Sequence, residues 1–165
     1  MDSVLSQPDE HFMHLAMAEA RRAETIGEVP IGAVLVLDGE IVGKGHNRRE
    51  VSNDPTAHAE MLAIRDAADR LDSWRLLDTA LYVTLEPCPM CMGAIILARI
   101  PRVVYACRDP RAGAAGSLFD LSCDERLNHR VEITEGILQQ ETSEMLSGFF
   151  RRLRDRKRAD KLIRE

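Results

Sequence analysis

Residues 81–91 read LYVTLEPCPMC, an apolar run followed by two cysteines, with a proline on each side of the first. The aromatic and β-branched run Leu81–Leu85 predicts a buried strand. Proline is favoured at the first position of a helix, so Pro89 predicts a helix that begins there, with Cys88 as its cap, and runs to about Arg99. The stretch thus predicts a strand that passes directly into a helix, as in layered α/β proteins.

The N-terminal side of this stretch predicts a helix followed by a hairpin. Apolar residues recur at helical spacing over residues 10–26, and Gly27 fits the end of that helix. The apolar residues 30–37 and the pair Ile41-Val42 flank Asp38-Gly39, a sequence typical of a two-residue β-turn.

Further elements follow on both sides of residues 81–91. After a polar loop at 47–55, Thr56 is placed to cap a helix from Ala57 to about Leu71. The second half predicts two short strands, a Gly/Ala-rich loop and a long terminal helix: residues 103–105, 131–133, 109–117 and about 138–160. Alternating strands and helices predict an α/β layered fold with a mixed sheet. At 165 residues, the chain is expected to form one domain over residues 1–165.

Composition narrows the class of protein. No window of about 18 apolar residues is present, so we expect no membrane-spanning helix. The polar segment Met1–Glu10 has no apolar signal core, so a secretory signal is not expected. Two of the four cysteines form a C-x-x-C pair that needs reduced thiolates, and this favours the cytoplasm.

Chemistry-bearing side chains are concentrated in His58-Ala59-Glu60 and in Cys88 with Cys91. One imidazole and two thiolates suit Zn²⁺, and three protein ligands leave a position open for water, as in a catalytic site. Glu60 is then placed to move protons on that water. The alternative is a structural zinc site, which would need a fourth Cys or His and would leave Glu60 without a role; Cys107 and Cys123 show no paired spacing to the motif and are expected to be bystanders.

The spacing sets a condition on the geometry. Residues two apart on a helix point about 200° apart, so His58 and Glu60 can share a target only at the first turn of their helix. Cys88 and Cys91 are three apart and face one side of their own first turn. We therefore expect two helix starts to converge on one ion, where the positive helix ends favour thiolates.

The pattern H-x-E followed by P-C-x-x-C is the signature of zinc nucleobase deaminases. Longer segments resemble the bacterial tRNA-specific adenosine deaminases in particular. These segments, which together cover roughly residues 12–155, are 28–36 (EVPIGAVLV), 54–60 (DPTAHAE), 81–88 (LYVTLEPC), 113–118 (GAAGSL), 128–138 (NHRVEITEGIL) and 149–152 (FFRR).

The resemblance implies a cytidine-deaminase-like, three-layer α-β-α fold with a central five-stranded mixed sheet, a homodimer, and one Zn²⁺ per subunit. It implies conversion of adenosine to inosine at the wobble position of a tRNA anticodon, typically that of the arginine tRNA with anticodon ACG. Within this resemblance the residues take the following roles: zinc ligands, His58, Cys88 and Cys91; catalytic carboxylate, Glu60; base and nucleotide contacts, Asn47, Val29, Ala59, Pro87, Arg108 and Asp109; anticodon-loop contacts, Phe149, Phe150, Arg151, Arg152 and Arg154.

Several of these contacts have plainer alternatives. Asn47 can be a turn residue, and Asp109 before Pro110 can start a turn. One of the two phenylalanines is expected to pack in the core. Residues 151–165 carry eight Lys/Arg and three Asp/Glu in a chain of net charge −5, so the terminal helix can either bind phosphates or present a solvated face.

Two rival functions remain. A guanine or cytosine free-base deaminase shares the zinc motif, but would not need the basic terminal helix or the Gly113–Ser117 loop. A non-catalytic tRNA-binding subunit of a deaminase heterodimer would be expected to lack the catalytic carboxylate, whereas Glu60 is present.

Overall fold

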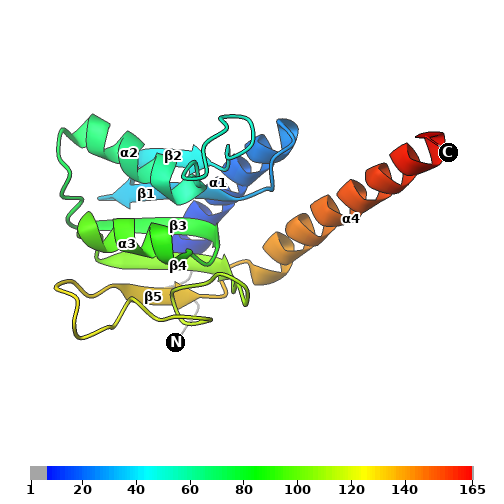
Figure 1. Cartoon of the computed structure of the whole chain (residues 1–165). Coiled ribbons are helices and arrows are strands. Elements are labelled where there is room, and N and C mark those ends of the chain that lie inside the picture. The colour runs from blue at the N-terminus through cyan, green and yellow to red at the C-terminus, as the bar shows by residue number, and fades with distance from the viewer. Residues whose placement is uncertain (1–6, 165) are drawn as a thin grey trace.

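The computed structural model describes residues 7–164 (Figure 1), so the expectations for residues 1–6 and 165 lie outside it. It contains one mixed sheet with helices on both faces. The elements in chain order are α1 (Gln7–Thr25), β1 (Gly32–Leu37), β2 (Glu40–His46), α2 (Ala59–Leu71), β3 (Thr79–Leu85), α3 (Pro89–Leu97), β4 (Arg102–Cys107), β5 (Glu132–Glu135) and α4 (Gln139–Arg164).

The five strands lie in the order β2-β1-β3-β4-β5. β1 is antiparallel to both β2 and β3, whereas β3, β4 and β5 are parallel. The β1–β2 turn has positive φ at Asp38 (51°) and Gly39 (79°), as a tight hairpin turn requires. The expected five-stranded mixed sheet is confirmed.

Three layers follow from the alternation of side chains along the strands. On one face, Val34 of β1 and Val104 of β4 pack against Met13 of α1. On the other face, Leu35 and Val103 belong to the core that α2 and α3 cover. Figure 1 shows α1 behind the sheet and α2 with α3 in front of it. The three-layer α-β-α prediction is therefore confirmed.

Helix α2 lies very close to β2, which fixes where its first turn points. A Cβ atom at Gly43 of β2 would be 2.3 Å from the carbonyl oxygen of Ala63. The predicted start of α2 was wrong by two residues: Thr56 does not cap it, and the N-cap is His58. The Thr56 hydroxyl and N–H both donate to the carboxylate of Asp54, at 2.7 and 2.8 Å, so a local turn uses the group expected to cap the helix.

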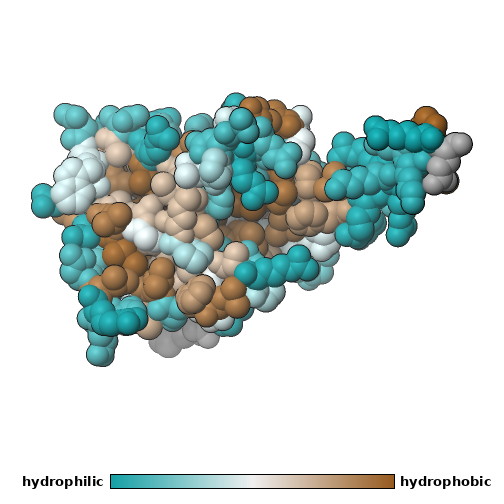
Figure 2. All heavy atoms as spheres, viewed as in Figure 1, coloured by the Kyte–Doolittle hydropathy of each residue, from teal (hydrophilic) through white to brown (hydrophobic). Residues whose placement is uncertain are grey.

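Helix α4 leaves the body of the molecule. Thr142 and Phe149 are buried, but every side chain from Phe150 to Arg164 is exposed apart from the half-buried Leu153. The helix extends to Arg164, four residues beyond the predicted end. Figure 2 shows a largely hydrophilic surface along this extension. Within residues 7–164, no helix is long and apolar enough to cross a membrane.

Candidate active site

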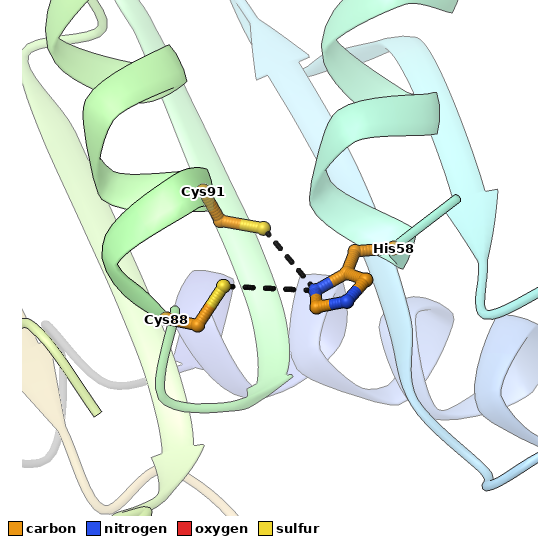
Figure 3. A group of neighbouring side chains, drawn as sticks. All are labelled: His58, Cys88 and Cys91. Carbon is orange, nitrogen blue, oxygen red and sulfur yellow. Dashed lines mark hydrogen bonds between the residues drawn. The ribbon is translucent and has the colours of Figure 1, made fainter. Parts of the chain in front are cut away.

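The predicted metal ligands lie at the facing ends of two helices (Figure 3). His58 is the N-cap of α2, Cys88 is the N-cap of α3, and Cys91 lies in the first turn of α3. The Nδ1 atom of His58 is 3.6 Å from the Sγ atom of Cys88 and 3.6 Å from that of Cys91. The two helix starts therefore converge on one point, as the spacing predicted.

These distances fit a tetrahedral ion. Zinc bonds of about 2.3 Å to sulfur and 2.0–2.1 Å to nitrogen, separated by about 109°, place sulfur and nitrogen about 3.6 Å apart. In the described part of the chain, the metal-binding group consists of His58, Cys88 and Cys91, with no fourth side chain. The bystander cysteines lie elsewhere: Cys107 is buried and its thiol donates to the carbonyl of Gln139, while Cys123 is exposed. This donor set belongs to the class with an open coordination position.

The two thiols are not equivalent. Hydrogen bonds from Cys91 and from His58 lower the pKa of Cys88 to about 4. The hydrogen bond to Cys88 and burial raise the pKa of Cys91. A bound cation would favour the thiolate form of both residues, because cysteine binds metal as a thiolate.

Glu60 is the second residue of α2 and is almost fully buried, with 4% of its surface exposed. Burial raises its pKa to about 7. A carboxyl group that titrates near neutrality beside a metal position is suited to accept and return protons.

Glu60, His58 and Cys88 line a cavity of about 230 Å³, whereas Cys91 is fully buried and is not part of its lining. That is smaller than the roughly 300–1,000 Å³ of pockets for drug-sized ligands, so it suits a single ring system. The lining residues are Val29, Ile31, Asn47, Arg49, His58, Ala59, Glu60, Leu85, Glu86, Cys88, Asp109 and Ala112. The structure therefore brings four predicted contact residues, Val29, Asn47, Ala59 and Asp109, to the predicted zinc ligands.

Asn47 and Asp109 are turn residues that also line the cavity. The side-chain oxygen of Asn47 accepts a hydrogen bond from the N–H of Arg49, and its amide donates to the carbonyl of Val29. The carboxylate of Asp109 accepts from the N–H groups of Arg111 and Ala112. The turn alternative thus describes their backbone contacts and is compatible with a second role toward a ligand.

Two predicted contacts lie outside the lining of the cavity. The guanidinium group of Arg108 is paired with the carboxylate of Glu135, at 2.7 Å. Pro87 presents its carbonyl oxygen to the N–H of Ala114. Both residues are thus engaged with neighbouring segments of the chain.

A groove continues from the cavity to the exposed part of α4. It has a volume of about 570 Å³ and shares Val29, Leu85 and Asp109 with the cavity. Its other lining residues are Arg111, Leu146, Ser147, Phe150, Arg151 and Arg154. The groove joins the metal position to an aromatic ring and three guanidinium groups.

The two predicted phenylalanines and the two neighbouring predicted arginines of α4 have different environments within each pair. Phe150 is 42% exposed in the groove, whereas Phe149 is 4% exposed and packs in the core, as expected for one of the two. Arg151 lines the groove, whereas Arg152 forms an ion pair with Glu24 of α1. Neighbouring residues on one helix therefore have different environments.

Five cavity residues were not predicted from the sequence: Ile31, Arg49, Leu85, Glu86 and Ala112. Leu85 and Glu86 directly precede the Pro-Cys motif, and Arg49 lies two residues after Asn47, so their proximity to predicted residues was a usable signal. Ile31 and Ala112 carry no chemical signal and are brought in by the fold.

Comparison with known proteins agrees with this geometry. Residues 6–107 match the family model of the cytidine and deoxycytidylate deaminase zinc-binding region. The tRNA-specific adenosine deaminase of Bacillus subtilis (strain 168) is 52% identical over 151 residues, which cover 92% of this chain and 94% of that protein.

Solved structures share the fold. One, from a study of A-to-I editing by tRNA:A34 deaminases at the wobble position of transfer RNA, is 46% identical with a TM-score of 0.79, covering 82% of this chain and 99% of its own. A guanine deaminase structure from Nitrosomonas europaea is 25% identical with a TM-score of 0.71, covering 85% of this chain and 83% of its own.

Proposed function

The chain belongs to the cytidine and deoxycytidylate deaminase family and, within it, to the tRNA-specific adenosine deaminases, and we propose that it converts adenosine to inosine at the wobble position of a tRNA anticodon. One observation supports this proposal beyond membership of the family: the cavity lined by Glu60, His58 and Cys88 shares Val29, Leu85 and Asp109 with the groove that ends on α4. A single base can enter the cavity while its neighbours lie along the groove.

His58, Cys88 and Cys91 would hold the zinc ion. When bound, zinc would supply Lewis acidity that lowers the pKa of a water to about 7. Glu60 would accept a proton from the attacking water and would return protons to the ring nitrogen and to the departing ammonia. Water adds its oxygen at C6 of the adenine ring, and the exocyclic nitrogen leaves, which gives inosine.

The cavity and groove residues position the RNA. One N–H of the Asn47 amide remains for the base, since the other donates to Val29. Ala59 and Val29 would contact the base, and Asp109 lines both the cavity and the groove. Phe150 offers a ring for stacking, and Arg151 and Arg154 offer charges for phosphates, which is how proteins hold single-stranded loops.

Four residues are left out of the proposed contact set: Pro87, Arg108, Phe149 and Arg152. Pro87 is not among the residues that line the cavity, and Phe149 is buried. Arg108 and Arg152 are already paired with carboxylates.

We also propose a cytoplasmic homodimer that binds one zinc ion per subunit and prefers the arginine tRNA with anticodon ACG, as the family resemblance implies.

The test is inosine formation on an unmodified arginine tRNA transcript with anticodon ACG, with guanine, cytosine and free adenosine assayed in parallel. We expect inosine at the wobble position and no turnover of the small substrates. Ammonia release from guanine or cytosine without inosine would instead establish the free-base activity, which the likeness to the guanine deaminase structure favours as the second candidate.

A further inference from the structure

Glu86, directly after β3, is a second buried carboxylate in the cavity, with 2% of its surface exposed. Its hydrogen bonds all come from the segment 109–117. Oε2 accepts from the N–H of Asp109 (2.9 Å) and from the hydroxyl of Ser117. Oε1 accepts from the N–H groups of Ala115 (3.1 Å) and Ser117 (3.0 Å).

These four donors occupy the carboxylate fully. An ionised carboxylate has about four lone-pair positions on its two oxygens, and each oxygen of Glu86 accepts two hydrogen bonds. No lone pair is left to take a proton from a reacting group. Glu86 therefore lines the cavity without being suited to proton transfer.

The backbone of the loop is folded directly onto this carboxylate. A Cβ atom at Gly113 would lie 2.3 Å from Cδ and from Oε2 of Glu86 and 2.6 Å from the carbonyl oxygen of Asp109, so only glycine fits there. The N–H of Gly113 donates to the carbonyl of Asp109, and its own carbonyl accepts from Leu118. The loop closes around Glu86 from both sides.

We infer that Glu86 is a positioning residue that anchors the loop 109–117 as the outer wall of the cavity and the adjoining side of the groove. The loop supplies Asp109 and Ala112 to the cavity and Arg111 to the groove. The reacting groups, in contrast, lie on α2 and α3. This role rests on the proposed deamination: Glu86 would hold the loop that binds the RNA, so its substitution should change KM more than kcat.

Two variants test this from opposite sides. Glu86→Gln replaces one oxygen by an NH₂ group that faces N–H donors, and Gly113→Ala pushes the loop away from an unchanged carboxylate. Each is expected to raise KM for the tRNA transcript about 10-fold, the effect of leaving buried polar groups unpaired. We expect kcat to change less than KM and zinc content to remain at one per chain. The double variant should be no worse than the more severe single one, because both release the same contact.

Amide hydrogen exchange gives a readout that is independent of activity. The N–H groups of Ala115 and Ser117 should exchange slowly in the unaltered protein and faster in both variants, while those of α2 and α3 stay protected. Asp124→Asn is the matched control, because this carboxylate also accepts a loop N–H, that of Arg126 at 2.9 Å, but lies outside the cavity lining. It should leave KM unchanged.

Three results would overturn the inference: unchanged KM and exchange rates in both variants, a loss confined to kcat, or strictly additive effects in the double variant. If Glu86→Gln fails to fold, Gly113→Ala decides alone. If the unaltered protein deaminates guanine and not tRNA, the proposed function fails, while exchange rates and KM for guanine in the same variants still test Glu86.

Discussion

Two buried glutamates in one cavity differ in what surrounds them. Glu60, in the first turn of α2, lies beside His58 and Cys88 in the cavity, and burial raises its pKa to about 7. Glu86, after β3, accepts four hydrogen bonds from one loop. Burial alone therefore does not separate a catalytic carboxylate from a positioning one; the number of filled lone pairs does.

The same contrast divides the cavity into a floor and a wall. The floor consists of the first turns of α2 and α3, whose side chains are placed by helix geometry. The wall consists of the loop 109–117, which is placed by hydrogen bonds to Glu86. Changes in the floor should stop the chemistry, whereas changes in the wall and the groove should weaken binding.

The largest effect is expected at the metal ligands. Cys91 is fully buried, and Cys91→Ala should reduce zinc from one per chain to near zero and abolish inosine formation, because two remaining ligands cannot hold the ion. Zinc content by elemental analysis and turnover on tRNA measure both effects. Cys123→Ala, at an exposed cysteine, should change neither. A Cys91→Ala protein that still binds one zinc ion per chain would show that Cys91 is not a metal ligand.

The next effect is expected at Glu60. Glu60→Gln keeps the shape of the side chain but removes the proton carrier, so kcat should fall by about 10²–10⁴ with zinc content and RNA affinity retained. Single-turnover rates and zinc content measure this. The two glutamates would then differ in the kinetic constant that their substitution changes: kcat for Glu60 and KM for Glu86. Loss of zinc in Glu60→Gln would show that Glu60 helps to hold the metal, and the proposed difference between a catalytic Glu60 and a positioning Glu86 would no longer stand.

In the groove, the two phenylalanines of α4 give a smaller and more selective effect. Phe150→Ala should weaken binding of the anticodon stem-loop by about 5- to 150-fold, the effect of losing one base-stacking contact. Phe149→Ala should instead lower the free energy of unfolding by about 3–5 kcal/mol, because this ring is buried. Binding titrations and denaturant melts separate the two. Equal loss of RNA affinity after correction for unfolding would contradict the division between core and groove.

The floor could be predicted from the sequence because its chemical groups lie close together along the chain. The motif residues His58, Glu60, Cys88 and Cys91 fall in two short segments, and the first turn of a helix is defined by a few neighbouring residues. The strand–helix alternation likewise gave the layers. The cap at Thr56 was wrong because Thr56 belongs to a turn in which its N–H and hydroxyl both donate to Asp54, and the helix begins only after His58.

The wall and the groove depend on contacts between distant segments. Glu86 lies 23 residues from Asp109 and 31 from Ser117, and nothing in the composition of the loop indicates its anchor. Similarly, a run of arginines does not say which of them face a ligand. Neighbouring residues on a helix point about 100° apart, so the docking of α4 on the body decides, and this docking is not encoded within α4.

The smallest predicted effect uses that difference. Arg151 lines the groove, whereas Arg152, one residue later, is paired with Glu24 of α1. Arg151→Ala should weaken RNA binding a few-fold and make the slope of log affinity against log salt shallower by about 0.7–0.9, the value for one lost phosphate contact. Arg152→Ala, which removes the same charge, should leave the slope nearly unchanged, because a guanidinium group already neutralised by Glu24 releases no counterion from RNA. Equal slopes in the two variants would show that α4 attracts RNA through its net charge alone, and the groove would then have no part in ordering the nucleotides beside the cavity.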